Sequence, residues 1–318
     1  MVVFIGDHVW SHVDPCSLRY LHRVHHAVRV DAPLDRFSEA RAIEHVRVLA
    51  HEIDGRQEGR QGLREAAEYI KAQLEKLEER AGSNFRIEIE ENVVVGPLGS
   101  PGAGDCGSCV ASLLEISRLT IDSGWVPPRP IILLFNGCKW FRETHKWCDT
   151  IGAFINVEAS GSGGLDLICQ SGPGSWPSSV YAQSAIYPMA HYRMFSEDYG
   201  NIPGLDIILL LGGYYYHTSY DTVDRLVPGS IQARGDNLYS TVKAFAESSK
   251  LKNGHERESL GVSDEYDDGR VVFFDYLTWF MIFYSRRIAV VLHSVPTHYA
   301  FLFMFSEFWV VVLLNNLQ

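Results

Sequence analysis

The chain has 318 residues, of which 46% are hydrophobic and 21% are charged, a composition typical of a globular protein with one large core. Its net charge of −11 argues against a nucleic-acid surface, because phosphate binding needs clustered lysine and arginine. Six cysteines in a chain of this length do not indicate a disulfide scaffold. We therefore expect a folded protein with no nucleic-acid partner.

The first segment, residues 1–30, is rich in histidine and shows neither helical nor strand periodicity. Its HRVHH cluster, residues 22–26, has ligand types that can bind metal, but an irregular head is the interpretation we favour. The segment has no basic start followed by a long apolar run, so no N-terminal signal or first membrane helix is recognisable in it.

Residues 31–82 carry apolar side chains at helical spacing and predict two helices. Ser38 is the expected N-cap of the first helix, and Gly82 is the expected end of the second. Apolar residues at 85, 87 and 89 then alternate with charged ones, which predicts a half-exposed edge strand over residues 85–89. A Gly/Pro loop, GPLGSPGAGDCGSC, leads into a predicted helix over residues 109–119.

Four apolar runs between residues 131 and 211 predict buried strands, and Asp236 is the expected cap of a later helix. Strands that alternate with helices predict an α/β fold with a mostly parallel sheet flanked by helices. This domain is expected to span residues 31–250, followed by a polar linker, residues 251–270. The predicted strands are IILLF at 131–135, FINVE at 154–158, LDLIC at 165–169 and LDIILLL at 205–211.

Residues 271–318 form an apolar segment of membrane type that carries only four charged side chains, Asp275, Arg286, Arg287 and Glu307. The run at residues 299–314 would be about 24 Å long as a helix, short of the roughly 30 Å hydrocarbon core of a bilayer. Extending it back to Ile288 reaches a spanning length, although Glu307 is an objection. We expect membrane contact here; a buried or interfacial helix is the alternative.

Three polar residues stand where predicted strands or loops end. Asp105 lies in GAGDC at the turn into a helix, Glu158 ends FINVE, and His217 follows LDIILLLGGYYY. Each alone has an ordinary structural explanation, as a cap or a surface residue. Two carboxylates and an imidazole on one edge of a parallel sheet are, together, a plausible set of ligands for a divalent metal.

Several stretches together resemble the co-catalytic zinc aminopeptidase family, in its endoplasmic reticulum metallopeptidase branch: GAGDC, LLFNG, INVEASGSGG and GLDIILLLGGYYYHTSYDTVDRL. The resemblance implies peptide hydrolysis by two zinc ions in an endoplasmic reticulum membrane protein with a luminal peptidase domain. It implies that Asp105 bridges the two ions, that Glu158 binds one and that His217 binds the other. It also implies that Tyr216 stabilises an oxyanion, and it makes Asp221 a candidate orienter of His217, with a turn-capping role for Asp221 as the alternative.

The chain also departs from that family. The family's first zinc ligand is a histidine in an H-x-D motif shortly before GAGDC, but this chain has no histidine between His51 and His145. The family follows its LLFNG strand with a Glu-Glu pair, a general base and a zinc ligand, yet no acid lies between Asp122 and Glu143 here. Three of the family's five metal-binding side chains remain, so we expect zero or one zinc ion.

The sequence therefore predicts a zinc metallopeptidase by family, aminopeptidase or carboxypeptidase in type, whose activity in this chain is impaired or lost. Its expected partners are a peptide substrate, if active, and membrane lipid through residues 271–318. A non-catalytic interaction protein or a truncated gene product is the alternative. Glu143, His145 and Cys138 are possible substitutes for the missing groups. Cys106-x-x-Cys109 has the spacing of a redox motif, although the resemblance accounts for this stretch without redox chemistry.

Overall fold

The structure is a computed structural model that describes residues 28–53, 60–91, 102–135, 146–147, 150–172, 174–189, 202–252, 271–276 and 279–295. Within these ranges the labelled helices are α2 (Glu39–Arg47), α3 (Gln61–Ala81), α4 (Cys109–Asp122), α6 (Trp176–Ser184) and α7 (Ser230–Glu247), and residues 286–295 form a further helix. The strands are β1 (Phe154–Ala159), β2 (Gly163–Gly172), β3 (Gly204–Leu211), β4 (Val271–Tyr276) and β5 (Phe280–Ser285). Short π-helical turns cover Val48–Glu52 and Ala103–Ser108, and 3-10 turns cover Gly82–Asn84, Gly213–Tyr215 and Val223–Arg225. The predicted α/β class is confirmed.

The main sheet is small and mixed, with its described strands in the order β1-β3-β2. β3 runs parallel to β1 and antiparallel to β2. The prediction of a mostly parallel sheet was therefore wrong for the described residues. The loop between β1 and β2, residues 160–162, is too short to return the chain to the other end of the sheet, so β2 must run back along β3.

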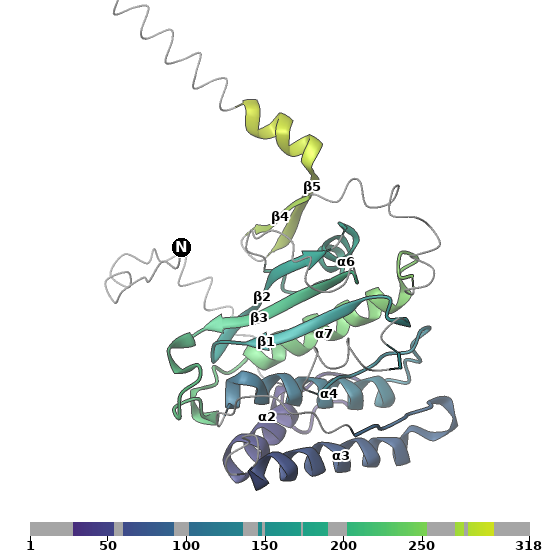
Figure 1. The fold of residues 1–318 in the computed structure, drawn as a ribbon, viewed down its shortest axis with the longest axis vertical. Helices are drawn as coiled ribbons and strands as arrows, with labels where there is room; N and C mark the ends of the chain where they lie inside the picture. The colour runs from purple at the N-terminus through teal and green to yellow at the C-terminus, as the bar shows by residue number, and fades with distance from the viewer. Residues whose placement is uncertain are drawn as a thin grey trace, which may run out of the picture.

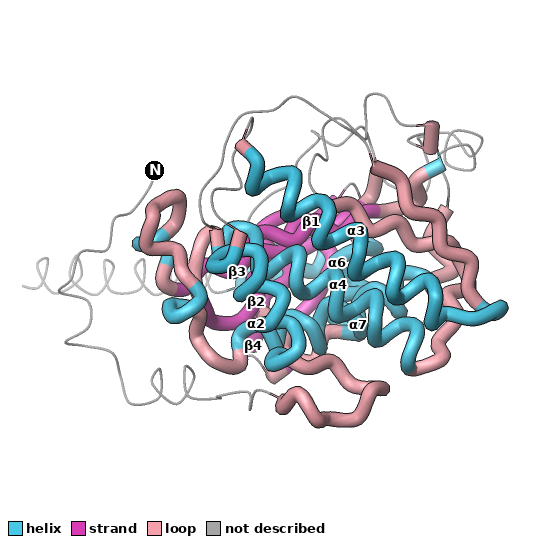
Figure 2. Tube along the Cα trace, turned by 90° about the horizontal axis from the view of Figure 1, so that it is seen from below, coloured by secondary structure: helices cyan, strands magenta, loops and turns pink. Residues whose placement is uncertain are grey.

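The helices are stacked in layers on the sheet. α4 and α7 lie along one face, and α2 and α3 lie on the far side of α4 (Figure 1). The view from below shows these helices in front of the strands (Figure 2). α6 packs beside β2 and α7.

Two predicted strands do not form. Residues 131–135 have no strand pairing, and Ile131 and Ile132 are exposed. Residues 85–89 keep the predicted alternation of exposure but are likewise not part of a sheet. In both cases the side-chain pattern suits a strand, but a strand exists only where a neighbour completes its backbone hydrogen bonds.

The helix boundaries follow local rules with one exception. Ser38 caps α2 as predicted, its hydroxyl accepting a hydrogen bond from the Arg41 amide at 3.3 Å. Gly82 follows α3 with φ of 64°, a value that glycine adopts readily. The prediction that Asp236 caps a helix was wrong, because the N-cap of α7 is Gly229 and Asp236 lies inside the helix. There the Asp236 carboxylate accepts a hydrogen bond from the Gln232 side chain.

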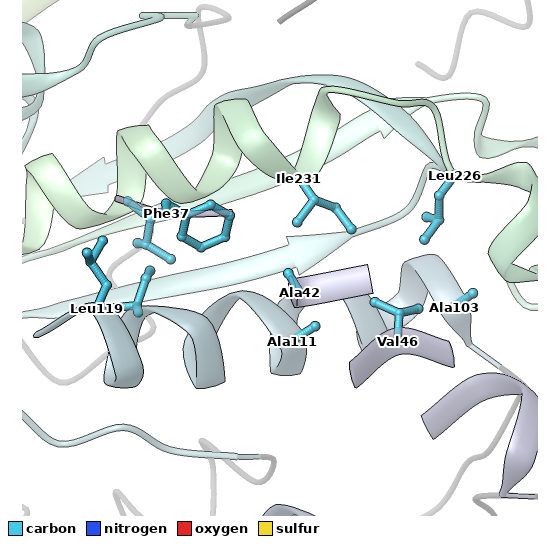
Figure 3. Packing of buried hydrophobic residues seen from close by; sticks show 10 residues of the cluster. Phe37, Ala42, Val46, Ala103, Ala111, Leu119, Leu226 and Ile231 are labelled. Carbon is cyan, nitrogen blue, oxygen red and sulfur yellow. The ribbon is translucent and has the colours of Figure 1, made fainter. Parts of the chain in front are cut away.

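The largest core cluster lies where α2, α4 and α7 meet. The labelled side chains of Phe37, Ala42, Ala111 and Ile231 point into the space between these helices (Figure 3). Small residues let the helices approach closely: a Cβ on Gly235 would come within 2.3 Å of the Phe37 ring. The close fit of α7 over Phe37 fixes the position of α7 against the rest of the domain.

A fully buried ion pair joins the sheet to the helices. Arg234 of α7 is 0% exposed and Asp166 of β2 is 3% exposed, with 2.8 Å between an Arg234 nitrogen and Asp166 Oδ1. The same guanidinium donates to Ser108 Oγ at 3.0 Å and to the Glu158 carbonyl at 2.7 Å. One side chain thus holds β1, β2, α7 and the segment before α4 together.

The C-terminal part of the described chain begins with a β-hairpin, in which β4 and β5 pair antiparallel. Residues 286–295 then form a helix, and residues 296–318 lie outside the described residues. The predicted apolar segment 271–318 therefore starts as a hairpin. In the part of the chain that the structure describes, no helix combines the length and apolar character needed to cross a bilayer.

Replacing Arg234 with methionine should lower the free energy of unfolding by about 3–5 kcal/mol, because Asp166 is left as an unpaired buried charge. The measurement is urea denaturation followed by circular dichroism. The control Arg64→Met, an exposed position on α3, should stay within about 0.5 kcal/mol of the parent. The double variant Arg234→Met/Asp166→Leu should lose less than Arg234→Met alone; an equal or greater loss would contradict the charge explanation.

Candidate metal centre

The candidate site lies at the edge of the sheet where the parallel strands β1 and β3 end. Glu158 stands near the end of β1, and His217 follows β3 after the turn Gly213–Tyr215. Asp105 lies in the π-helical turn Ala103–Ser108, just before α4. This turn packs against β1. Three segments far apart in the sequence therefore reach the same edge, as carboxyl-terminal ends of parallel strands favour.

The three predicted metal ligands are brought together around Asp105. His217 Nε2 lies 3.0 Å from Asp105 Oδ2. The potential ligand atoms of Asp105, Cys106 and Glu158 all lie within 4.8 Å of one another. Carboxylate oxygens and imidazole nitrogens are ligands that zinc uses in proteins. Potential ligand atoms of Glu158 and of His217 therefore both lie close to Asp105, and their metal-binding roles stay predictions.

The local charge of the cluster is negative. Burial, followed by the charges of Asp105 and Asp206, raises the pKa of Glu158 above its usual range. Partial burial, together with the charges of Asp105 and Glu158, also raises the pKa of Tyr216. A cation between Asp105 and Glu158 would offset the repulsion between their carboxylates.

Tyr216 and His217 are held as a pair. Their rings are stacked, with centroids 3.7 Å apart and planes 19° from parallel. The backbone of His217 has φ of 57°, in the left-handed region that non-glycine residues occupy rarely. This backbone turn sets the direction in which the imidazole leaves the chain and places it beside Asp105.

Asp221 supports Asp105, and it does so through the backbone. Its Oδ1 accepts a hydrogen bond from the Gly104 amide at 2.8 Å, and its Oδ2 accepts one from the Asp105 amide at 3.0 Å. Its own carbonyl accepts a further bond from the Ala103 amide at 3.1 Å. The sequence suggested Asp221 as an orienter of His217; the structure instead uses both of its carboxylate oxygens to position the turn that carries Asp105.

Glycines let the loops approach closely at this edge. A Cβ on Gly161 would come within 2.5 Å of the Leu210 and Leu211 backbone, and one on Gly104 within 2.8 Å of the Gly161 carbonyl oxygen. The loops enclose a small hollow next to the ligands. It is lined by Asp105, Ser160, Gly161, Ser162, Gly212, Tyr215, Tyr216 and Asp221.

Two supporting features were not predicted as parts of the site. The first is the Arg234 guanidinium, which donates a hydrogen bond to the backbone carbonyl of the candidate ligand Glu158. It also donates to Ser108 Oγ, in the segment that follows the candidate ligand Asp105. The signal for it was an acid, Asp166, inside the apolar strand LDLIC, which needs a buried partner. The second feature is a disulfide between Cys106 and Cys109, directly after Asp105.

The possible substitutes for the missing groups, Glu143, His145 and Cys138, lie outside the described residues. Their proposed roles stay predictions. The histidine-rich residues 1–27 and most of the linker, residues 253–270, lie outside them as well.

Residues 91–242 match the model of peptidase family M28. This part of the chain is a peptidase family M28 domain. The resemblance found in the sequence is thereby confirmed at the level of the family. The matched range contains Asp105, Glu158, Tyr216, His217 and Asp221, so the edge of the sheet described above lies inside the M28 domain.

The chain is similar to parts of longer proteins. Endoplasmic reticulum metallopeptidase 1 of Homo sapiens is 33% identical over 259 residues, which cover 73% of this chain and 27% of the human protein. Putative endoplasmic reticulum metallopeptidase 1-B of Caenorhabditis elegans is 35% identical over 219 residues, 61% of this chain and 23% of that protein. The chain thus spans about a quarter of the length of these curated relatives.

A solved structure supports the fold. The LapA aminopeptidase of Legionella pneumophila matches with a TM-score of 0.50 and 14% identity, covering 69% of this chain and 75% of that one. At this identity the match concerns the α/β fold alone. The M28 domain therefore has the fold of an aminopeptidase, while its site has to be judged from its own residues.

Replacing Asp221 with alanine should lower the free energy of unfolding by about 2–4 kcal/mol, because two backbone amides lose their charged acceptor. It should also weaken zinc binding at least about tenfold, since Asp105 is no longer positioned. Thermal denaturation and zinc titration measure the two effects. The matched control is Asp224→Ala, three residues away and exposed. Unchanged zinc affinity in Asp221→Ala would remove the positioning role.

Proposed function

We propose that this chain is a metallopeptidase domain with a depleted site, which binds a single zinc ion and hydrolyses peptides slowly or not at all. The observation that carries the proposal is the meeting of Asp105 with both Glu158 and His217 at one edge of the sheet. These three residues match family ligand positions, whereas the remaining ligand positions have no counterpart in the chain. Three protein ligands and one water satisfy the usual coordination of a catalytic zinc.

The remaining residues define what the site could do. Zinc, when bound, supplies a Lewis acid that polarises a carbonyl and lowers the pKa of a bound water. The Tyr216 hydroxyl, whose pKa is raised, stays protonated at neutral pH and can donate a hydrogen bond to a developing oxyanion. Binding and polarisation are thus retained in part.

Proton transfer is the step that this chain lacks. The family's general base follows the LLFNG stretch, and here no acid occurs between Asp122 and Glu143. A positioned acid–base group typically contributes about 10²–10⁴-fold to a rate. The loss of the base together with two ligands therefore supports weak peptidase activity or none.

A non-catalytic interaction protein is the second candidate, and the same missing base favours it. Under this alternative the fold is retained for binding a partner, and the ligands are remnants. Metal content separates the two: a zinc-binding, slowly hydrolysing domain retains stoichiometric metal, and a pure binding domain does not.

We extend the proposal to location and membrane contact. The curated relatives are named endoplasmic reticulum metallopeptidases, which supports the endoplasmic reticulum, with the M28 domain luminal. The helix at residues 286–295 begins with two arginines, Arg286 and Arg287, and exposes a series of aliphatic side chains. This combination suits the surface of an anionic bilayer. The exposed residues are Ile288, Val290, Val291, Leu292 and Val295.

The purified full chain should contain one zinc ion per molecule and should hydrolyse aminoacyl-p-nitroanilides at least about 10²-fold more slowly than a complete M28 aminopeptidase assayed beside it. Any turnover should vanish with a chelator and in Glu158→Gln, but not in the exposed control Glu78→Gln. Loss of turnover in Glu143→Gln would identify a substitute base. Two tightly bound zinc ions with turnover near that of the reference enzyme would contradict the depleted site.

The full chain should float with vesicles of mixed zwitterionic and anionic phospholipid in a density gradient. Val290→Asp/Val291→Asp should reduce the bound fraction, because two charges replace apolar contacts on the exposed helix face. Val126→Asp, at an exposed position in the loop after α4, is the matched control and should bind as the parent does. Equal flotation of all three would place membrane contact elsewhere in the chain.

A further inference from the structure

The disulfide Cys106–Cys109 lies inside the candidate metal centre. Cys106 directly follows the metal-ligand candidate Asp105, and Cys109 is the first residue of α4. Among the described residues the other cysteine, Cys169, lies on β2 and is not part of a disulfide. The Cys106–Cys109 disulfide is therefore distinguished from Cys169 by its position next to Asp105.

The Cys106 sulfur is placed like a ligand. Its Sγ and the carboxylate oxygens of Asp105 and Glu158 lie within 4.8 Å of one another. Ligand atoms about 2.0–2.3 Å from a tetrahedral zinc lie roughly 3.5 Å apart, so small side-chain movements would complete the geometry. His217 Nε2 lies 3.0 Å from Asp105 Oδ2, so the imidazole would have to move slightly away from this oxygen to reach that spacing. Two carboxylates, an imidazole and a thiolate are together a four-ligand set for zinc.

The disulfide removes one member of that set. A sulfur bonded to another sulfur has no thiolate to offer, and the thiolate is the form that binds metal. With the disulfide closed, Asp105, Glu158 and His217 remain as protein donors. With the disulfide open, Cys106 becomes the fourth donor, which compensates for part of the ligand loss evident in the sequence.

Cys109 has a partner that keeps it in place when the disulfide opens. Its Sγ lies 3.5 Å from an Arg234 nitrogen, and the residue is buried. The same arginine is anchored by Asp166, so this contact does not depend on the disulfide. Reduction therefore releases Cys106 toward the two carboxylates while Cys109 stays docked at the start of α4.

We propose that this site is a thiol-gated zinc site: reduction of the Cys106–Cys109 disulfide completes a four-ligand set of Asp105, Cys106, Glu158 and His217 for one Zn²⁺. The reductant is a dithiol. Its two thiols give their hydrogens and two electrons to the disulfide, which yields two cysteine thiols and the oxidised, disulfide form of the reductant. Zn²⁺ binding then releases the Cys106 thiol proton to solvent. The inference rests on the proposed function in taking Asp105, Glu158 and His217 as ligands.

The full chain is tested with Zn²⁺ and with Co²⁺ as a spectroscopic probe, before and after reduction with a dithiol that is then removed. Reduction should tighten Zn²⁺ binding at least about tenfold, because a direct ligand is gained. Co²⁺ should give a thiolate-to-metal charge-transfer absorption in the near ultraviolet with the reduced chain, and this band should be much weaker with the oxidised chain.

Three cysteine variants separate the explanations. Cys106→Ser should lose the band and the effect of reduction, whereas Cys109→Ser should show the band without a reductant, because its Cys106 cannot form this disulfide. Cys169→Ser is the matched control and should behave as the parent.

A band that persists in Cys106→Ser, or equal Zn²⁺ affinity of the oxidised and reduced chains, would overturn the inference while the proposed single-zinc site stands. No metal bound by any form would overturn both.

Discussion

The buried ion pair between Arg234 and Asp166 is the interaction on which the rest of this domain depends. Its guanidinium reaches a strand residue, a carbonyl on a second strand and the hydroxyl just before α4, so α7 is tied to the sheet and to α4 through one side chain. Removing an arginine from such a place leaves a charge with no water to solvate it. The edge of the sheet that carries Asp105 and Glu158 lies next to this ion pair. Hydrogen bonds from Arg234 therefore help to position both candidate ligands.

The loops that position the candidate ligands are present in this domain, although we propose that its catalytic base is lost. The backbone devices that position the ligands are intact: Asp221 holds the turn of Asp105, and the left-handed backbone at His217 aims the imidazole. In the proposed function, the family's general base and two of its metal ligands have no counterpart in this chain. Scaffold and chemistry can separate because packing and hydrogen bonding stabilise the loops of the fold, whereas a general base contributes to rate and not to stability.

The disulfide beside Asp105 affects how many protein ligands the proposed zinc site can offer. A thiolate binds zinc more strongly than a further water does, and the Cys106 sulfur lies within 4.8 Å of carboxylate oxygens of Asp105 and Glu158. Under the proposed thiol-gated binding, the site would have a changed ligand set and would not simply be an M28 centre with ligands removed. With Cys106 as a ligand, the zinc content of the site would depend on the redox state of the two thiols. A site built only from carboxylates and an imidazole has no such dependence.

The sequence by itself determined the α/β class, the strands β1, β2 and β3, the caps at Ser38 and Gly82, and the three residues that meet at the site. These follow from periodicity, from local cap chemistry and from motifs, which are properties of short stretches. Tertiary structure decided the rest: residues 131–135 found no neighbouring strand, β2 turned antiparallel, α7 began before Asp236, and Asp221 bonded the Asp105 turn. Each of these depends on which distant segment supplies a partner, and a buried hydrogen-bonding group takes the partner that the packed fold brings to it.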